Sequence, residues 1–409
     1  MTTLSGDRLA LHLDRFVAVR TEASERFFTD EADRIARLCH LMAERFARGG
    51  RLLALGALPQ ARSDARHVAV EFVHPVIVGK RALPALALVP DGGSLLDQLE
   101  LVARAEDMAI GFGLEGLDGA SRASLLAARE KGLLTISFSP GAEWEFLLPT
   151  SDPFVGQELA ETLYHVLWEL VHVFFEHRGL LNGREQRAIH DAGGSSFLYP
   201  FLAEQEADLE SVVADVGRSV LIKARETSEL RASTIADARS ELTAAAIALH
   251  EAFESGGALF AFGNGGSATD AMDCVADFRA APQGWRARRC FDLTEDTAIL
   301  TALANDIGSD ALFARQLIAH ARPGDVALAL STSGGSRNIV EALAEARRRG
   351  LRTIAFLGYD GGAVAAGGLA DHVVVVPSEH IPRIQEAHAS SLHALRELVE
   401  LLQPEGSQG

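Results

Sequence analysis

The chain has 409 residues, of which 48% are hydrophobic and 23% charged, and its formal net charge is −18 at pH 7. This composition is typical of a soluble globular protein, and the length accommodates two domains of about 200 residues each. The negative charge argues against nucleic-acid binding as the main task, because nucleic-acid-binding proteins usually present a basic face.

Cysteine usage and the N-terminal residues indicate the compartment. Cys39, Cys274 and Cys290 have neither the spacing of a disulfide framework nor that of a zinc knuckle, which favours a reducing environment. The first residues lack a basic segment followed by an apolar one, so we expect no signal peptide. No uninterrupted apolar stretch approaches membrane-spanning length. We therefore expect a cytoplasmic protein with no membrane and no nucleic-acid partner.

In chain order, the patterns predict alternating helices and strands in each half. The first half opens with a long helical region at about 7–47, and later has a helix at 123–133 followed by a strand at 134–138. The second half opens with a long helical region at about 204–254, in one piece or two. Further predicted elements are a strand at 258–262, a strand and helix within 291–304, a strand at 326–330, a helix at 339–351 and a strand at 352–356.

Two Gly/Ser-rich loops follow buried strands in the second half. They read Gly263-Asn264-Gly265-Gly266-Ser267 and Ser331-Thr332-Ser333-Gly334-Gly335-Ser336, and each precedes a predicted helix. Such loops place hydroxyls and backbone N–H groups at a helix N-terminus, where anions bind. Neither loop fits a nucleotide-binding motif, so a terminal sugar phosphate is the better ligand. Turns with no function are the alternative.

Three ordered matches indicate that the chain is a duplication. Residues 49–72 resemble 256–278, and 123–133 resemble 339–351. In the third match, Gln157 precedes His165 by eight residues, as Gln385 precedes His393. The matches predict two tandem α/β domains, 1–195 and 196–409, each a parallel sheet covered on both faces after a leading helical segment. Loop signals place the junction near 181–203.

The first half lacks the hydroxyl-rich loops but keeps a polar set. Pro59 and Glu115 occupy its corresponding loops, and Pro59 removes a backbone donor whereas Glu115 would repel phosphate. Four side chains on its helices suit a metal site or an acid–base cluster: His67, Glu71, Gln157 and His165. Ordinary helix surface or hydrogen-bonded core groups are the alternative.

The second half carries a different set at the matching positions: Asp273, Asp277, Gln385 and His393. Carboxylates suit a divalent metal, but Asp is one methylene shorter than Glu, so a metal would sit differently or be absent. His388, one turn before His393, is expected to pack or hydrogen-bond. The polar turn at Asn305-Asp306 is a further candidate for substrate binding through Asp306.

The second half resembles the sugar isomerase (SIS) domain family, specifically its sedoheptulose 7-phosphate isomerases (phosphoheptose isomerases). The resemblance is carried by FGNGGSATDAMDCVADF, LANDIG, LALSTSGGSRNIVEALAEARRRGLRTIAFLGYDGG and RIQEAHASSLH, and covers most of 200–405. The first half resembles the family faintly. The resemblance implies flavodoxin-like doubly wound sheets, a homo-oligomer (here a dimer of tandem chains) and a ketose–aldose isomerisation through an enediol(ate).

The resemblance also implies roles for the matching residues. It implies zinc, or another divalent metal, held by the His/Glu/Gln/His positions, with Glu71 or Asp277 as base and His165 or His393 as acid. It implies phosphate binding by the loop residues Asn264, Ser267, Ser331, Thr332, Ser333 and Ser336. The sequence departs from the family pattern at Asp273 and Asp277. Since each half keeps what the other lacks, one hypothesis is a site composed from both halves.

Two functions fit these expectations. The first is an isomerase that converts D-sedoheptulose 7-phosphate to D-glycero-D-manno-heptose 7-phosphate or a related heptose phosphate. The second is a non-catalytic sugar-phosphate-binding regulatory or protein-interaction protein, because the SIS fold also serves such roles and fold does not fix function.

Overall fold

The computed structural model describes residues 3–76, 80–113, 118–176 and 208–403, which form two compact units. Residues 22–226 form the first, here called the N-terminal unit. Residues 1–21 join 227–409 in the second, the C-terminal unit. The predicted junction at 181–203, with its boundary between 195 and 196, lies outside the described residues.

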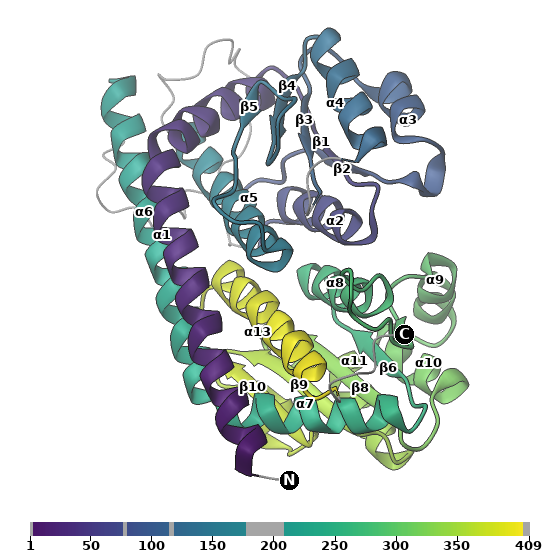
Figure 1. Ribbon diagram of the computed structural model, residues 1–409. Coiled ribbons are helices and arrows are strands. Elements are labelled where there is room, and N and C mark those ends of the chain that lie inside the picture. The colour runs from purple at the N-terminus through teal and green to yellow at the C-terminus, as the bar shows by residue number, and fades with distance from the viewer. Residues whose placement is uncertain (1–2, 77–79, 114–117, 177–207, 404–409) are drawn as a thin grey trace. The chain divides into compact units, whose positions relative to one another are not determined.

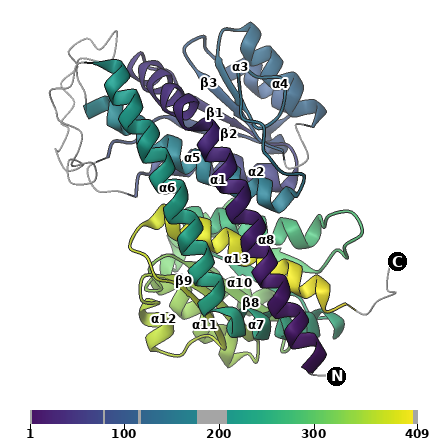
Figure 2. The ribbon, with the colours of Figure 1, turned by 60° about the vertical axis from the view of Figure 1, so that its left-hand side comes forward.

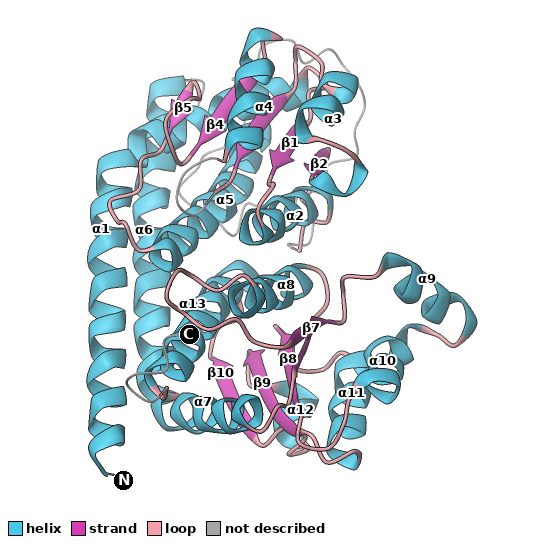
Figure 3. Cartoon of the chain, turned by 45° about the vertical axis from the view of Figure 1, so that its right-hand side comes forward, coloured by secondary structure: helices cyan, strands magenta, loops and turns pink. Residues whose placement is uncertain are grey.

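Each unit is built on one five-stranded parallel sheet (Figure 3). The N-terminal sheet contains β1 (Leu52–Leu55), β2 (Ala85–Leu88), β3 (Met108–Gly111), β4 (Leu134–Ser137) and β5 (Trp144–Glu145). The C-terminal sheet contains β6 (Leu259–Phe262), β7 (Cys290–Asp292), β8 (Val326–Ser331), β9 (Arg352–Gly358) and β10 (His372–Val376). The spatial orders are β2-β1-β3-β4-β5 and β7-β6-β8-β9-β10, so the second strand lies outside the first in both. This is the flavodoxin-like order, and the predicted fold class is confirmed.

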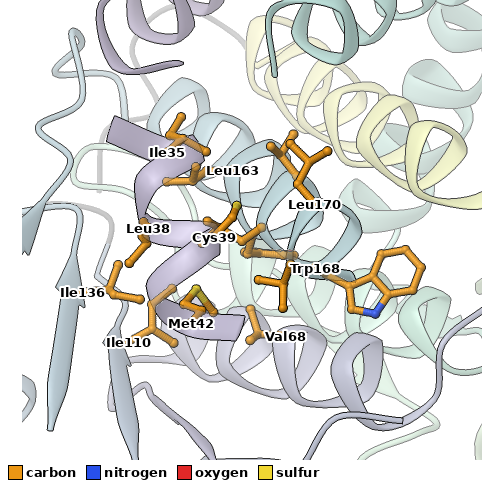
Figure 4. Close-up of a cluster of buried hydrophobic side chains, with 14 of the residues drawn as sticks. Ile35, Leu38, Cys39, Met42, Val68, Ile110, Ile136, Leu163, Trp168 and Leu170 are labelled. Carbon is orange, nitrogen blue, oxygen red and sulfur yellow. The ribbon is translucent and has the colours of Figure 1, made fainter. Parts of the chain in front are cut away.

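Helices cover both faces of the N-terminal sheet (Figure 1). The helices are α1 (Thr3–Ala47), α2 (Pro59–Val73), α3 (Leu95–Val102), α4 (Gly119–Glu130), α5 (Pro153–Glu176) and α6 (Leu209–Asp237), with a 3-10 turn at Pro90–Gly92. Apolar residues of α1, α2, α5 and α6 share one buried cluster, while those of α3 and α4 share another. Figure 4 shows part of the first cluster, where Ile35 and Met42 of α1 pack with Val68, Ile110 and Leu163.

The C-terminal sheet is covered in the same way. Its helices are α7 (Arg239–Glu254), α8 (Gly266–Arg279), α9 (Thr297–Asp306), α10 (Leu312–His320), α11 (Arg337–Arg348), α12 (Gly362–Ala366) and α13 (Ile381–Leu401), with a 3-10 turn at Ser309–Ala311. One cluster joins α7, α8 and α13, and the other joins α10, α11 and α12. Successive side chains of a strand point to opposite faces. Accordingly, Leu259 and Ala261 belong to the first cluster, and Phe260 and Phe262 to the second.

Two long helices contribute residues to both units. Figure 2 shows α1 and α6 as continuous helices, and the predicted helical region at 204–254 is divided at Ala238, between α6 and α7. The beginning of α1 belongs to the C-terminal unit, where Leu9, Leu13 and Phe16 lie in the cluster formed with α7 and α13. His12 Nε2 lies 2.7 Å from Oε2 of Glu397 on α13. Residues 22–47 of the same helix pack in the N-terminal unit.

Within the described residues, none of the helices combines the length and the apolar character that a membrane crossing requires.

Candidate functional site

The two Gly/Ser-rich loops follow adjacent parallel strands of the C-terminal sheet. β6 pairs with β8, and the loops leave the carboxyl ends of both strands. β6 and β8 also flank the position where the strand order reverses, which is where flavodoxin-like sheets bind ligands. The observed topology therefore brings the two predicted anion loops to one edge of one sheet.

The loop after β6 leads directly into α8. Ser267 lies in the first turn of α8 and is 3% exposed. A Cβ at Gly263 would come within 2.2 Å of the Ser267 carbonyl oxygen, so only glycine permits this close turn. Gly56 in the N-terminal unit is under the same constraint, because a Cβ there would lie 1.9 Å from the Ala61 carbonyl oxygen. The loop after β6 and the loop after β1 thus share a close approach of the backbone to the helix that follows each of them.

Serine hydroxyls accept hydrogen bonds from backbone N–H groups within the loop after β8. The Ser331 hydroxyl oxygen accepts a hydrogen bond from the Gly334 N–H at 3.1 Å, and that of Ser333 accepts one from Gly335 N–H at 3.2 Å. Ser336 immediately precedes α11, and its side chain makes no capping hydrogen bond there. The N-terminus of α11, with its partial positive charge, therefore follows a loop that carries Thr332, Ser333 and Ser336.

An amide pair ties the first loop to the helix that follows the second. Asn264 Nδ2 donates to Asn338 Oδ1 at 3.0 Å, and Asn338 Nδ2 donates to Asn264 Oδ1 at 2.8 Å. Asn338 lies on α11 and was not among the residues that sequence patterns identified. The Asn264 amide is thus engaged within the protein, and its observed contact positions the loops.

The remaining predicted substrate residue lies at a helix end. Asp306 is the last residue of α9 and is exposed. Its carboxylate accepts a hydrogen bond from the side-chain amide of Asn305 at 2.6 Å.

The corresponding loops of the N-terminal unit differ in chemistry. Pro59, predicted in a loop, is the first residue of α2, where its missing N–H removes one donor from the helix N-terminus. Leu58 precedes it and gives no side-chain cap. Glu115, the other residue predicted to disfavour phosphate, lies outside the described residues.

The polar set of the N-terminal unit assembles between α2 and α5. His67 and Glu71 come from α2, and Gln157 and His165 from α5, and all four are less than 5% exposed. The Nε2 atoms of His67 and His165 lie 3.4 Å apart. His67 Nε2 lies 3.9 Å from the Glu71 carboxylate. His67 and Glu71 therefore meet His165, which is far from them in sequence, in one buried polar cluster, and Gln157 lies two turns before His165 on the same helix.

Burial sets the protonation of this cluster. It lowers the pKa of His67 well below the ordinary value, with the neighbouring His165 acting in the same direction. Burial raises the pKa of Glu71 to about 7, opposed by His165 and supported by Glu169. A neutral imidazole offers a lone pair to a metal or a proton. A carboxyl group with a pKa near neutrality suits proton transfer.

One member of the cluster was missed by the sequence patterns. Ligand atoms of His67, Glu161 and His165 all lie within 4.8 Å of one another. Glu161 is four residues after Gln157 and four before His165, so the three share one face of α5. This spacing is present in the sequence, but the predicted internal repeat does not reveal it, because Ala389 occupies the matching position of the C-terminal unit.

The C-terminal unit assembles its own set between α8 and α13. His393 Nε2 lies 3.6 Å from the Asp277 carboxylate and 3.9 Å from that of Asp273. Ligand atoms of these three residues are also within 4.8 Å of one another. Gln385, 2% exposed, lies two turns before His393 on α13. Both matching sets thus occupy equivalent places in the two sheets' helical layers.

Both clusters fit a divalent cation. Two nitrogen ligands at about 2.0–2.1 Å from a tetrahedral zinc ion lie about 3.3–3.4 Å apart, which matches the 3.4 Å between His67 and His165. In the part of the chain that the structure describes, Gln385 Oε1 is buried without a hydrogen-bond partner, which is unusual for a polar atom in a core. A cation would satisfy such an atom.

Comparisons with known proteins agree with this fold. Residues 224–358 match the SIS domain family. A phosphoheptose isomerase of Citrifermentans bemidjiense is 46% identical over 151 residues, which cover 37% of this chain and 78% of that protein. A phosphoheptose isomerase of Geobacter metallireducens is 40% identical over 189 residues, covering 45% of this chain and 97% of that protein.

A solved structure extends the likeness to the whole chain. The C-terminal domain of glucosamine-fructose-6-phosphate aminotransferase from Francisella tularensis superposes with a TM-score of 0.56 at 11% identity, covering 95% of each chain. At this identity the likeness concerns the fold alone. The chain belongs to the SIS-domain family of phosphoheptose isomerases, which are aldose–ketose isomerases.

Proposed function

We propose that this protein interconverts a ketose phosphate and an aldose phosphate. The most specific form of the proposal is the conversion of D-sedoheptulose 7-phosphate to D-glycero-D-manno-heptose 7-phosphate or a related heptose 7-phosphate. The observation that carries it is the pair of hydroxyl-bearing loops at the switch point of the C-terminal sheet, tied together by Asn264 and Asn338. The identity to phosphoheptose isomerases supports the choice of a heptose.

The loops would hold the phosphate end of the substrate. Ser267, Thr332, Ser333 and Ser336 stand at or beside the N-termini of α8 and α11, where hydroxyl and N–H donors combine with the helix dipole. Ser331 would contribute by shaping the loop through its bond to Gly334. Holding the phosphate fixes the reacting carbons and removes much of the entropic cost of reaction.

The isomerisation requires a base and an acid. A base takes the proton from the carbon beside the carbonyl, and an acid supplies a proton to the oxygen that gains charge. The carboxylates in matching positions are Glu71 and Asp277, and the imidazoles are His165 and His393. A zinc ion or other divalent cation bound by ligands drawn from the His67/Glu71/Gln157/His165 set, or from the Asp273/Asp277/Gln385/His393 set, would polarise the carbonyl oxygen.

One observation favours a second function, a protein that binds sugar phosphate without turnover. The C-terminal unit carries the phosphate loops, but it has Asp273 and Asp277 where the N-terminal unit has His67 and Glu71. The Asp side chains are shorter than His and Glu, so they change how far a metal ligand at position 273 and a base at position 277 extend from the helix. A binding protein would keep the loops and lose the reaction.

Incubation with sedoheptulose 7-phosphate, with and without zinc, separates the two functions when the sugar carbons are followed by NMR. New signals of an aldoheptose 7-phosphate support the isomerase. Saturable shifts of the substrate signals without turnover support the binding protein. If neither turnover nor binding is observed, the heptose assignment is refuted. Sedimentation of the same sample would test the expected dimer of tandem chains.

A further inference from the structure

We infer that Glu161 is the carboxylate ligand of a divalent metal in the N-terminal unit, together with His67 and His165, and that Glu71 is not needed to hold the metal. The inference rests on the proposed function, from which the metal comes. It changes the ligand set expected there by bringing in a residue that has no counterpart in the C-terminal unit, where Ala389 matches Glu161.

The geometry of the cluster carries the inference. His67, Glu161 and His165 each offer one ligand atom, and these atoms lie within 4.8 Å of one another. All three side chains are buried, at 3%, 4% and 0% exposure, so competition from bulk water is small. Two imidazoles and one carboxylate form a donor set found in zinc sites that keep an open position.

The helix that carries Glu161 fixes its direction. Gln157, Glu161 and His165 follow one another at four-residue steps on α5, so they form one row facing α2. His67 reaches this row from α2, and its ring packs edge-on against that of His165, with centroids 5.1 Å apart. Glu161 therefore occupies the middle of the row, between the amide and the imidazole.

Glu71 is a neighbour of the group formed by His67, Glu161 and His165 but is not a member of it. Its Oε1 lies 3.9 Å from His67 Nε2, but among the described His, Cys, Asp and Glu side chains it belongs to no group of three whose ligand atoms all lie within 4.8 Å of one another. Its Oε2 is buried and makes no hydrogen bond to any described residue. A carboxylate that is adjacent to the metal without binding it remains available to exchange a proton with substrate.

The test measures metal affinity in the full chain, independently of turnover. Asp273→Asn and His393→Gln are present in every sample, so that the Asp273/Asp277/His393 group is removed. Cobalt is titrated while its visible absorption is followed, and zinc affinity is obtained by competition. Glu161→Gln, Glu71→Gln and the control Glu158→Gln are compared. Glu158 is also buried on α5, at 2% exposure, but is absent from the ligand group.

Glu161→Gln is expected to weaken cobalt and zinc binding at least about 30-fold and to alter the cobalt spectrum. Loss of even an indirect partner of a metal ligand costs about 10–100-fold. Glu71→Gln and Glu158→Gln are expected to stay within about threefold of the background protein. Glu161→Asp, which keeps the charge at shorter reach, is expected to recover part of the affinity.

Three results would overturn the inference: unchanged affinity in Glu161→Gln, a comparable loss in Glu71→Gln, or no metal binding by the background protein. Circular dichroism and thermal melting establish that each variant is folded. If Glu161→Gln does not fold, Glu71→Gln decides the question, because retained affinity supports the inference and lost affinity refutes it. Absence of isomerase activity in the unsubstituted protein, with metal affinity as expected in the variants, would instead count against the proposed function.

Discussion

Asn264 and Asn338 exchange two side-chain hydrogen bonds, at 3.0 and 2.8 Å, across 74 positions of sequence. The pair joins the loop after β6 to the start of α11, and so joins the two loops proposed to bind phosphate. Because each amide uses both its donor and its acceptor on the other, removal of either residue leaves the partner's amide without both bonds.

This pair predicts a double-mutant result. Asn264→Ala and Asn338→Ala should each weaken sugar-phosphate binding about 10-fold, because either change releases one loop from the other. The double variant should be no weaker than the single variants, since residues that act through one contact are not additive. Calorimetry with sedoheptulose 7-phosphate measures this. Gln403→Ala, which removes a side-chain amide that contacts His250 on α7, is the matched control, and additive losses would refute the coupling.

Gly334 and Gly335 offer a matched test of the second loop. Gly334 has φ of +59° and a Cβ there would lie 2.1 Å from the Gly361 carbonyl oxygen, whereas at Gly335 the nearest atom would be 3.8 Å away. Gly334→Ala should therefore lower the melting temperature and abolish phosphate binding. Gly335→Ala should leave the melting temperature within about 2 °C. Equal effects of the two substitutions would show that backbone crowding does not govern this loop.

His388 predicts a dependence of stability on pH. Burial lowers the pKa of His388 from 6.5 to about 4. Above about pH 6.5 the ring is neutral in both the folded and the unfolded chain, and its contribution is fully present. As the pH falls toward 4, the unfolded chain binds a proton that the folded chain excludes, so stability decreases by up to about 3 kcal/mol.

Substitution isolates this contribution. His388→Leu places an apolar side chain of similar volume beside Phe356 and removes the titrating imidazole. Urea unfolding at pH 7.5, 6, 5 and 4.5 should show a smaller loss of stability in the variant than in the natural protein. The buried His67 titrates in both proteins and cancels in the comparison. Parallel pH profiles would contradict the assignment to His388.

Glu71 and Asp277 occupy matching positions, and turnover distinguishes them. We predict that Glu71→Gln lowers kcat at least about 1,000-fold while sugar-phosphate affinity stays within about threefold, because a general base contributes about 10²–10⁴-fold to the rate. The pKa of Glu71 near 7 suits that role. Asp277→Asn is measured in parallel. A fully active Glu71→Gln variant would exclude Glu71 as the base, and loss in Asp277→Asn alone would transfer that role.

Much of the fold follows from local patterns in the sequence. Buried apolar runs that open into Gly/Ser loops predict β6 and β8, which the structure places at 259–262 and 326–331. The order of strands does not follow from these patterns, because β7 is separated along the chain from β6 by α8 and its place at the sheet edge depends on packing. The flavodoxin-like order came from the family resemblance.

The candidate site was predicted in part. Its loops and the four-residue sets were visible as a motif and a repeat, and the structure brings His67 and Glu71 close to each other and His67 close to His165, and brings His393 close to Asp273 and Asp277. Asn338 was missed because it is identified only by what it faces across the fold, the loop after β6. Glu161 was missed although its spacing is present in the sequence, because it has no counterpart in the C-terminal unit and its contact with His67 on α2 depends on the fold. The ligand roles, the zinc ion, the dimer and the cytoplasmic location remain predictions.

The packing of the first part of α1 against helices late in the sequence restricts the order in which this chain folds. The segment containing Leu9, Leu13 and Phe16 is synthesised before the rest of its unit, yet it completes a hydrophobic cluster whose other members include Leu395 and Leu398, close to the last described residues. Arg20 and His12 on that segment also hold Glu397. During translation, the C-terminal unit cannot close its core until α13 has left the ribosome. For the same reason, no single cut of the polypeptide separates the two units. A fragment beginning at residue 208 would lack α1 and would expose the apolar side chains of the C-terminal unit that Leu9, Leu13 and Phe16 cover.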